Sequence, residues 1–252
     1  MNESNKIIRK SATIEMCKVS DADLALINGY ALRELMQDEV FAFRVILCGN
    51  AVDRVFERFS DAALEDMRGL YIGKTVIKDH ARRADGQIAR IYATELTAPD
   101  ASGYRSLIAS CYMVRTESNA DLIREIEGGI KREGSVSFSP KSYVCSICGQ
   151  DNMKEYCSHF PGVQYRRDGK DITCIFTIDG VNDCYEFSLV AVPAQPEAGV
   201  CKSYKDALKT QPQAEADQKE ANPEPEAENT AKNNLARRLL KARLRAAKNR
   251  CR

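Results

Sequence analysis

The sequence predicts an α+β fold, in which a mostly antiparallel, closed or barrel-like sheet is accompanied by a few helices. Many segments rich in β-branched and aromatic residues are separated by turn residues, whereas only two or three segments carry helix signals. Because strands outnumber helices and alternate with them unevenly, an α+β arrangement is favoured. A hydrophobic fraction of 44% over 252 residues is ordinary for a globular protein, so one real core is expected.

Two helices are predicted in the first third of the chain from their caps. Ser20 is followed by Asp23 in the manner of a capping box, and a helix is expected from there to Met36. Ser60 is the expected cap of a shorter helix that ends near Gly69. Strands are expected on either side of this second helix and beyond it, at 40–48, 71–77, 87–96, 106–114 and 185–192.

A third helix is predicted just before a serine-rich strand. Asn119 is its expected cap, and Gly134 is expected to end it directly before the strand. Its apolar stripe consists of Leu122, Ile123, Ile126 and Ile130. The strand that follows contains the segment SVSF, which begins at Ser135.

Composition divides the chain into three regions. Residues 1–204 hold nearly all aromatic and β-branched residues and are predicted to form the folded domain. Residues 205–232 are rich in Pro, Ala, Glu and Gln, and this composition predicts a disordered acidic linker. Residues 233–252 contain no acid and place leucine and alanine at helical spacing, which predicts a basic amphipathic helix.

The overall charge and the apolar pattern limit the classes of partner. Lys and Arg number 37 against 36 Asp and Glu, so no net field draws the whole molecule to nucleic acid or to anionic lipid, and nucleic-acid binding is not favoured. The first residues lack an apolar signal segment and no long apolar run follows, so a cytoplasmic protein without a membrane partner is expected. The ten cysteines then indicate metal binding or buried thiols rather than a secreted disulfide framework.

Two residues stand where reactive side chains are often held. His80 follows an apolar strand and precedes a charged turn, and Ser135 stands where a predicted helix gives way to a strand. A serine hydroxyl becomes a nucleophile only beside a base, and a neutral imidazole is the usual one. The alternatives are a surface histidine and a structural serine, because each signal alone is weak.

A family resemblance joins these residues. The order GKTVIKDH, QIARIYATEL, GGIKREGSVSF and DCYEFSLVAVPAQPEAGV is similar to the prohead serine proteases of tailed phages. The closing stretch resembles the family pattern E-x-S-x-V-x-x-P-A-N-P-x-A, with Gln195 in place of the usual Asn. The resemblance covers about residues 38–202, including Asn50 and Asp53. It implies an assemblin-like fold and a serine endopeptidase with His80 and Ser135 as catalytic residues.

The sequence leaves the nucleophile and the third catalytic residue open. Family members often have a small apolar residue and glycine after the serine, whereas Ser137 and Ser139 follow here and are rival nucleophiles. In the family the third member resembles an acid on the strand after the histidine. That resemblance makes Glu95 the best match, with Asp79 and Asp100 as alternatives.

A second group of residues has the spacing of a metal site. Cys145 and Cys148 form a C-x-x-C knuckle, and Cys157 and His159 would complete a Cys3His set for a structural zinc within an insertion at 143–165. The alternatives are reduced, unliganded cysteines, or His159 as a second catalytic histidine of the assemblin type. The remaining cysteines in apolar stretches are expected to be buried, and they are Cys17, Cys48, Cys111, Cys174 and Cys184.

The resemblance implies a place and a set of partners. The expected substrates are the scaffold protein, the major capsid protein, the portal and the protease itself, cleaved inside the assembling prohead in the host cytoplasm. No cofactor is expected in the chemistry. The rival interpretation is a non-catalytic assembly or scaffold protein whose zinc knuckle and basic tail bind partners or nucleic acid.

Overall fold

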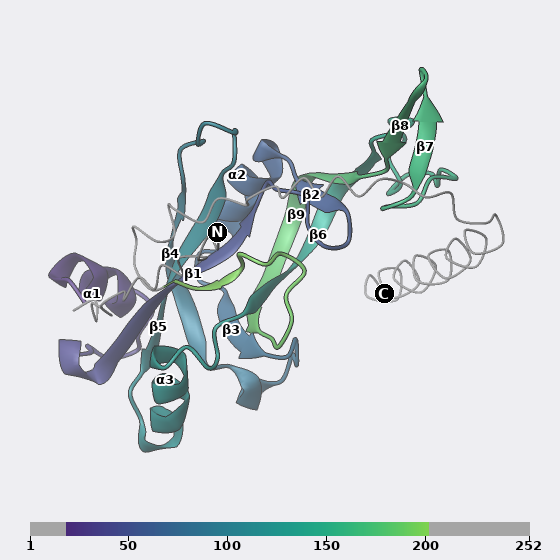
Figure 1. Ribbon diagram of the computed structural model, residues 1–252. Helices are drawn as coiled ribbons and strands as arrows, with labels where there is room; N and C mark the ends of the chain where they lie inside the picture. Colours follow the sequence, from purple (N-terminus) through teal and green to yellow (C-terminus); the bar gives the residue numbers. More distant parts are fainter. Residues whose placement is uncertain (1–18, 202–252) are drawn as a thin grey trace, which may run out of the picture.

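The computed structural model describes residues 19–201, which form a mixed α+β domain made mostly of sheet (Figure 1). The predicted linker at 205–232, the predicted basic helix at 233–252 and Cys17 lie outside the described residues. Within the described part, no helix is long and apolar enough to cross a membrane. The fold class expected from the sequence is therefore confirmed at the level of α+β with few helices.

The helices are short and the strands carry most of the structure. The α-helices are α1 Asp21–Asn28, α2 Asp61–Leu70 and α3 Ala120–Glu127, with single 3-10 turns at Gln37–Glu39, Ala84–Gly86 and Glu117–Asn119. The strands are β1 Val40–Gly49, β2 Glu57–Phe59, β3 Thr75–Lys78, β4 Ala89–Leu96, β5 Ser106–Val114, β6 Gly134–Cys145, β7 Gln164–Arg167, β8 Lys170–Thr173, β9 Phe176–Leu189 and β10 Gly199–Val200.

The main sheet has eight strands and contains both antiparallel and parallel pairs. Its strand order is β10-β1-β5-β4-β3-β9-β2, and β6 pairs antiparallel with β9 along its whole length. Both β3 and β2 pair with β9 in parallel. The strands β7 and β8 form a separate hairpin that projects beyond the far end of β6 and β9 (Figure 1). Strand β9 thus pairs both with β6, which carries Ser135, and with β3, which ends two residues before His80.

Residues 19–201 do not form the predicted closed barrel. The strand path is open at β10 and β2, and the contact between β10 and the start of β6 is not a ladder but an isolated bridge between Glu133 and Gly199 with single backbone hydrogen bonds on either side of it. Beside this bridge, the N–H of Val200 donates to the carbonyl of Arg132 at 2.7 Å. A physical reason is that β10 has only two residues, so it cannot build a continuous ladder with β6.

The core lies between the sheet and helices α2 and α3. It includes Leu47, Leu64, Met67, Ile91 and Leu107, all fully buried. The capping interaction of α2 is as predicted, since the Ser60 hydroxyl accepts from the N–H of Ala63 at 3.0 Å. These contacts place α2 against β9 and fix the sheet beneath the candidate site.

Helix α1 is shorter than the sequence predicted. The capping box of Ser20 and Asp23 is present, but the helix ends at Asn28 rather than at Met36. The Asn28 side chain accepts from the N–H of Leu35 at 2.9 Å and donates to its carbonyl at 3.2 Å. This pair of bonds folds the chain back on itself, so the helix cannot continue.

Helix α3 begins directly after Asn119, as predicted, but Asn119 does not cap it through its side chain and the helix ends earlier than expected. The Asn119 side chain donates to the Val114 carbonyl and accepts from the N–H of Thr116, and it does not cap the helix. The helix ends at Glu127, because Gly129 takes a left-handed conformation with φ 71°. The predicted stripe is buried except at Ile130, which lies beyond the helix and is 74% exposed. Gly134 therefore begins β6 and does not end a helix.

Candidate active site and metal site

The backbone of His80 is held against β9 in an uncommon conformation. Strand β3 ends at Lys78, and both Asp79 (φ 52°) and His80 (φ 53°) lie in the left-handed region. Residues other than glycine adopt this conformation at a cost, and such strain gathers at functional sites. The N–H of Asp79 donates to the Leu189 carbonyl at 3.0 Å, and the N–H of His80 donates to the Ser188 hydroxyl at 2.8 Å. Strand β9 thereby fixes the position of the histidine.

The His80 imidazole is hydrogen-bonded to a buried carboxylate. Its Nδ1 lies 2.8 Å from Oε1 of Glu186, which is 2% exposed. With Nδ1 protonated and donating to this carboxylate, Nε2 keeps its lone pair and can accept a proton. The other carboxylate oxygen, Oε2, is buried and has no hydrogen-bond partner within residues 19–201. A buried carboxylate oxygen without a hydrogen-bond partner lowers the stability of the fold. Such a carboxylate beside a half-exposed imidazole is typical of a functional acid.

The register of β6 and β9 brings two serines to the face that holds Glu186. Ser135 lies opposite Ser188, and Ser137 lies opposite Glu186. Residues directly opposite in an antiparallel pair point to the same face of the sheet. Two predicted site residues, His80 and Ser135, are therefore brought to one face, since both adjoin Ser188. Ser139 lies further along, opposite Asp183 and beyond the register shift.

Ser137 is engaged by a cation. Its hydroxyl oxygen accepts from Nη2 of Arg82 at 2.6 Å, and the same guanidinium stacks 4.7 Å from the centre of the Tyr185 ring. A guanidinium that donates to a hydroxyl oxygen withdraws electron density from it and so weakens it as a nucleophile. This contact favours Ser135 over Ser137.

A buried tyrosine braces the site from the core side. Between the pairs Ser137–Glu186 and Phe138–Cys184 the register shifts, and Tyr185 is the additional residue on β9. The hydroxyl of Tyr71 lies in this bulge and donates to the carbonyls of Ser137 at 3.2 Å and Glu186 at 3.3 Å. Burial raises the pKa of Tyr71 well above its usual value, so it stays a neutral donor. Bulges of this kind re-aim side chains beside active sites.

Gly134 is required immediately before the candidate nucleophile. A Cβ atom at this position would lie 1.9 Å from Cζ of Phe187, whose ring is fully buried. No side chain fits there without moving the ring. The glycine that the sequence placed before Ser135 therefore lets β6 pack closely on β9.

Glu95, the acid expected to partner His80, is instead paired with an arginine in the described structure. Its Oε2 lies 2.7 Å from Nη2 of Arg44, an ion pair across β4 and β1. Asp100 is also engaged elsewhere, since its Oδ1 accepts from the N–H groups of Ser102 and Tyr104 in a turn. In the described part of the chain, the carboxylate bonded to His80 is that of Glu186. The signal for Glu186 was its place as the acid of the E-x-S pattern, two residues before Ser188.

Three other motif residues have structural roles. The amide of Gln195 pairs with the backbone of Gly49, accepting at 2.8 Å and donating at 3.0 Å. The Asn50 side chain donates to the carbonyl of Gly103 at 3.0 Å. Asp53 accepts from two backbone N–H groups of its own loop, each at 2.9 Å. Gln195 thus fastens the loop after β9 to the end of β1, although the resemblance led us to expect Asn there.

The predicted metal ligands converge at the end of β6. One ligand atom from each of Cys145, Cys148, Cys157 and His159 lies within 4.8 Å of the others. Four ligands around a zinc at about 2.3 Å would be separated by about 3.8 Å, so only small movements are required. This Cys3His cluster could hold a metal ion.

Two further observations fit a metal at this cluster. Nδ1 of His159 is buried and finds no hydrogen-bond partner among the described residues. Burial raises the pKa of the Cys145 thiol, but hydrogen bonds from the backbone of Cys148 and Ile147 outweigh it, so the pKa is lowered. A fifth sulfur, that of Cys174, lies 3.8 Å from Cys145 and is fully buried. The sequence analysis placed Cys174 only as a buried thiol.

The metal cluster and the candidate active site lie at different parts of β6. Ser135 is near the start of the strand, whereas Cys145 is its last residue. The cluster therefore belongs to the base of the β7–β8 hairpin (Figure 1). No protein-family model, curated protein or solved structure matches the chain.

Proposed function

We propose that this chain is a serine endopeptidase in which Ser135 is the nucleophile, His80 the base and Glu186 the acid that orients His80. The observation that carries the proposal is the 2.8 Å contact of His80 Nδ1 with the buried Glu186 carboxylate. Acid–histidine pairs of this geometry fix the tautomer that can accept a proton from a serine. The register that places Ser135 opposite Ser188, the residue that binds the His80 backbone, supports the choice of serine.

The reaction follows the acyl-enzyme route. His80 Nε2 takes the proton of the Ser135 hydroxyl while the oxygen attacks the substrate carbonyl, and the protonated imidazole then gives its proton to the leaving amine. His80 next takes a proton from a water molecule while the water oxygen attacks the acyl-enzyme carbonyl. The imidazolium then gives this proton to the Ser135 oxygen as the ester bond breaks, which releases the acid product and restores the serine. Glu186 stabilises the imidazolium in both steps without being protonated itself.

The proposed substrates follow from the family resemblance. The resemblance to prohead proteases implies that the substrates are the scaffold protein, the major capsid protein and the protease itself, cleaved within the assembling prohead. The composition of residues 205–232 predicts a target for self-cleavage. This segment contains three of the eight prolines, no aromatic residue and more acids than bases. A protease needs several residues free of secondary structure to cut a chain.

We also propose that the Cys3His cluster binds zinc as a structural ion. The donor set of three thiolates and one imidazole is one that zinc prefers, and four protein ligands leave no position for a water. The ion would fasten the base of the β7–β8 hairpin to the end of β6. The chemistry at Ser135 would then proceed without it.

Self-cleavage is the experiment that tests the proposal. The full chain is expressed as wild type, Ser135→Ala and Ser137→Ala, and the intact masses are measured over time. Wild type and Ser137→Ala are expected to lose about 20 to 50 C-terminal residues, while Ser135→Ala stays full length. Processing by Ser135→Ala equal to that of wild type would contradict the assignment of the nucleophile.

A second function is supported by one observation, the metal cluster at the base of a projecting hairpin. A non-catalytic assembly protein could bind a partner or a single-stranded nucleic acid through such a zinc loop. A chain that binds zinc and a partner but whose mass and peptide substrates stay unchanged would favour this alternative. The buried Glu186 carboxylate beside His80 argues against it, because a binding module has no need for that pair.

A further inference from the structure

Arg82 is a cation on the face of the sheet that carries the proposed nucleophile. Its Nη2 donates to the Ser137 hydroxyl at 2.6 Å, and Ser137 follows Ser135 by two positions in strand β6. Side chains two positions apart in a strand point to the same face, and their Cα atoms are separated by about 6.8 Å, twice the rise per residue. A side chain of a bound peptide near the attacked carbonyl therefore comes within reach of the guanidinium.

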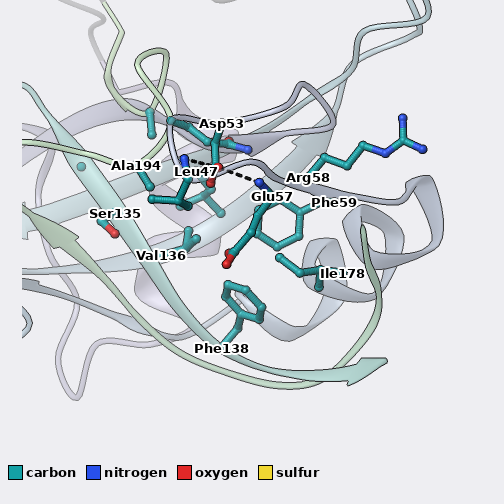
Figure 2. A pocket seen from close by; sticks show the side chains of 14 residues that line it. Leu47, Asp53, Glu57, Arg58, Phe59, Ser135, Val136, Phe138, Ile178 and Ala194 are labelled. Atoms are coloured by element: carbon teal, nitrogen blue, oxygen red, sulfur yellow. Dashed lines mark hydrogen bonds between the residues drawn. The ribbon is translucent and has the colours of Figure 1, made fainter. Parts of the chain in front are cut away.

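The opposite face of β6 borders an apolar cavity of about 200 Å³ (Figure 2). Figure 2 shows Val136 and Phe138 among the residues that line this cavity, with Ser135 at one end of it. Because side chains alternate along a strand, the hydroxyl of Ser135 points to the other face, where Arg82 lies. A peptide carbonyl that Ser135 attacks is therefore on the side of the guanidinium.

Two contacts orient the Arg82 side chain. One is the hydrogen bond to the Ser137 hydroxyl, and the other is the Tyr185 ring, whose centre lies 4.7 Å from the guanidinium carbon. Both partners are uncharged, so they restrict the arginine without neutralising it. A guanidinium that is already oriented loses less conformational freedom when it binds a ligand.

The charge of Arg82 is not matched by a carboxylate within residues 19–201, whereas its neighbour Arg83 is paired with Asp85 at 3.1 Å. The Glu186 carboxylate on the same face is buried and is already bonded to His80. A guanidinium has five N–H donors, and in the described part of the chain a single nitrogen of Arg82 donates to the protein. Donors therefore remain for a second partner.

We infer that Arg82 forms a specificity subsite for the carboxylate of a glutamate or aspartate side chain of the substrate, within two residues of the cut bond. A carboxylate can accept two parallel hydrogen bonds from one edge of a guanidinium. A glutamine side chain has the size of glutamate but lacks both the charge and the second acceptor. The inference rests on the proposed function, because it takes the peptide bound at Ser135 to be a substrate.

The chain itself carries a segment of this chemistry. From Glu215 to Glu228 the sequence has six Asp or Glu and a single basic residue, Lys219. These acids belong to the segment 205–232, whose composition predicts a target for self-cleavage. Self-cleavage through the Arg82 subsite would therefore occur within two residues of one of these acids. The new C-terminus of the processed chain, read by mass spectrometry, gives an independent record of the preference.

Matched peptides test the subsite. A peptide series carries glutamate, glutamine or lysine at each of the positions around one scissile bond. At one position, wild type is expected to cleave the glutamate peptide about fivefold faster than the glutamine peptide, the effect of a strong ion pair at an exposed site. Arg82→Gln should bring this ratio close to one and keep the rate on the glutamine peptide. Arg83→Gln, which breaks the exposed pair with Asp85, is the matched control and should keep the ratio.

Binding separates this subsite from the proposed function. The Ser135→Ala protein is titrated with the same peptides, and the glutamate peptide should bind about fivefold more tightly than the glutamine peptide unless Arg82→Gln is added. Equal affinities in this titration would overturn the subsite, and so would a preference that Arg82→Gln leaves intact. If peptides bind with the glutamate preference but wild type cuts none of them, the proposed protease activity fails and the acidic-peptide site stands.

Discussion

His80 and Glu186 form a pair in which a 41% exposed imidazole is hydrogen-bonded to a side chain that is only 3% exposed. Strand β9 supplies both the acid and, two residues later, the hydroxyl of Ser188 that binds the His80 backbone. The histidine is therefore fixed at two points by one strand. Its orientation depends on the packing of β9 and not on the mobility of a surface turn.

Replacing Glu186 with Gln tests the role of this pair. The amide keeps the size of the side chain but cannot stabilise an imidazolium, and it permits the wrong tautomer. The rate of peptide cleavage should fall on the order of 10²- to 10⁴-fold, with KM little changed. Glu95→Gln is the matched control, because it breaks the ion pair with Arg44 instead and should retain activity. Equal losses in the two variants would remove Glu186 from the mechanism.

Ser188→Ala should release the backbone of His80. The variant leaves the N–H of a left-handed residue without its acceptor, so a loss of about 1–3 kcal/mol in unfolding free energy is expected from urea denaturation. The catalytic rate should fall more than that of Ser106→Ala, which alters another buried serine far from His80 in the sequence. A rate equal to that of the control would mean that the loop keeps its conformation without Ser188.

Tyr71→Phe should loosen the bulge beneath the site. The change deletes a buried hydroxyl that donates to the carbonyls of Ser137 and Glu186. We expect the unfolding free energy to drop by about 1–3 kcal/mol and hydrogen exchange to rise in β6 near Ser137. Unchanged exchange there, together with unchanged stability, would show that the two strands hold this register without the tyrosine.

Metal content and its dependence on single ligands test the cluster. Protein purified without chelator should contain about one zinc per chain, and Cys157→Ser should lose it. Cys174→Ala should keep the ion, because Cys174 neighbours Cys145 but lies outside the convergent set of four. If Cys174→Ala lost the zinc and Cys157→Ser kept it, Cys174 and not Cys157 would be the third cysteine ligand.

Chelation should act on the hairpin before it acts on the chemistry. Removing zinc is expected to raise hydrogen exchange in the 143–165 insertion, which the proposed ion would fasten to β6. Peptide cleavage should persist, because Ser135 lies at the opposite end of that strand. Immediate loss of all cleavage on chelation, reversed only by zinc, would give the metal a role beyond structure.

The sequence predicted the elements whose signals are local. The Ser20 and Ser60 caps depend on residues three positions apart, and both interactions are present. The predicted C-terminal ends of the two helices were wrong. Helix α1 is ended by the bonds of Asn28 with Leu35, which form only after folding, and α3 ends before the left-handed Gly129 and not at Gly134. The closed barrel was also wrong, since strand patterns do not reveal how few residues β10 contributes.

The candidate site shows the same division. The spacing of Cys145, Cys148, Cys157 and His159 indicated a cluster, and these four residues do converge. The acid partner of His80 could not be chosen by proximity in sequence, because 106 residues separate His80 from Glu186. Only the parallel pairing of β3 with β9 brings them together. The acid of the E-x-S pattern is the necessary clue, although in the sequence it stands only as part of a family signature.

The central claim, that Ser135 is a nucleophile activated by His80, is tested most directly by labelling with a fluorophosphonate. Such reagents bond to serine oxygens that an adjacent base activates. Tryptic mass spectrometry of the wild-type chain should find one adduct on Ser135, retained in Ser137→Ala and lost in Ser135→Ala and His80→Ala. An adduct on Ser137, or no adduct on folded wild-type protein, would contradict the account.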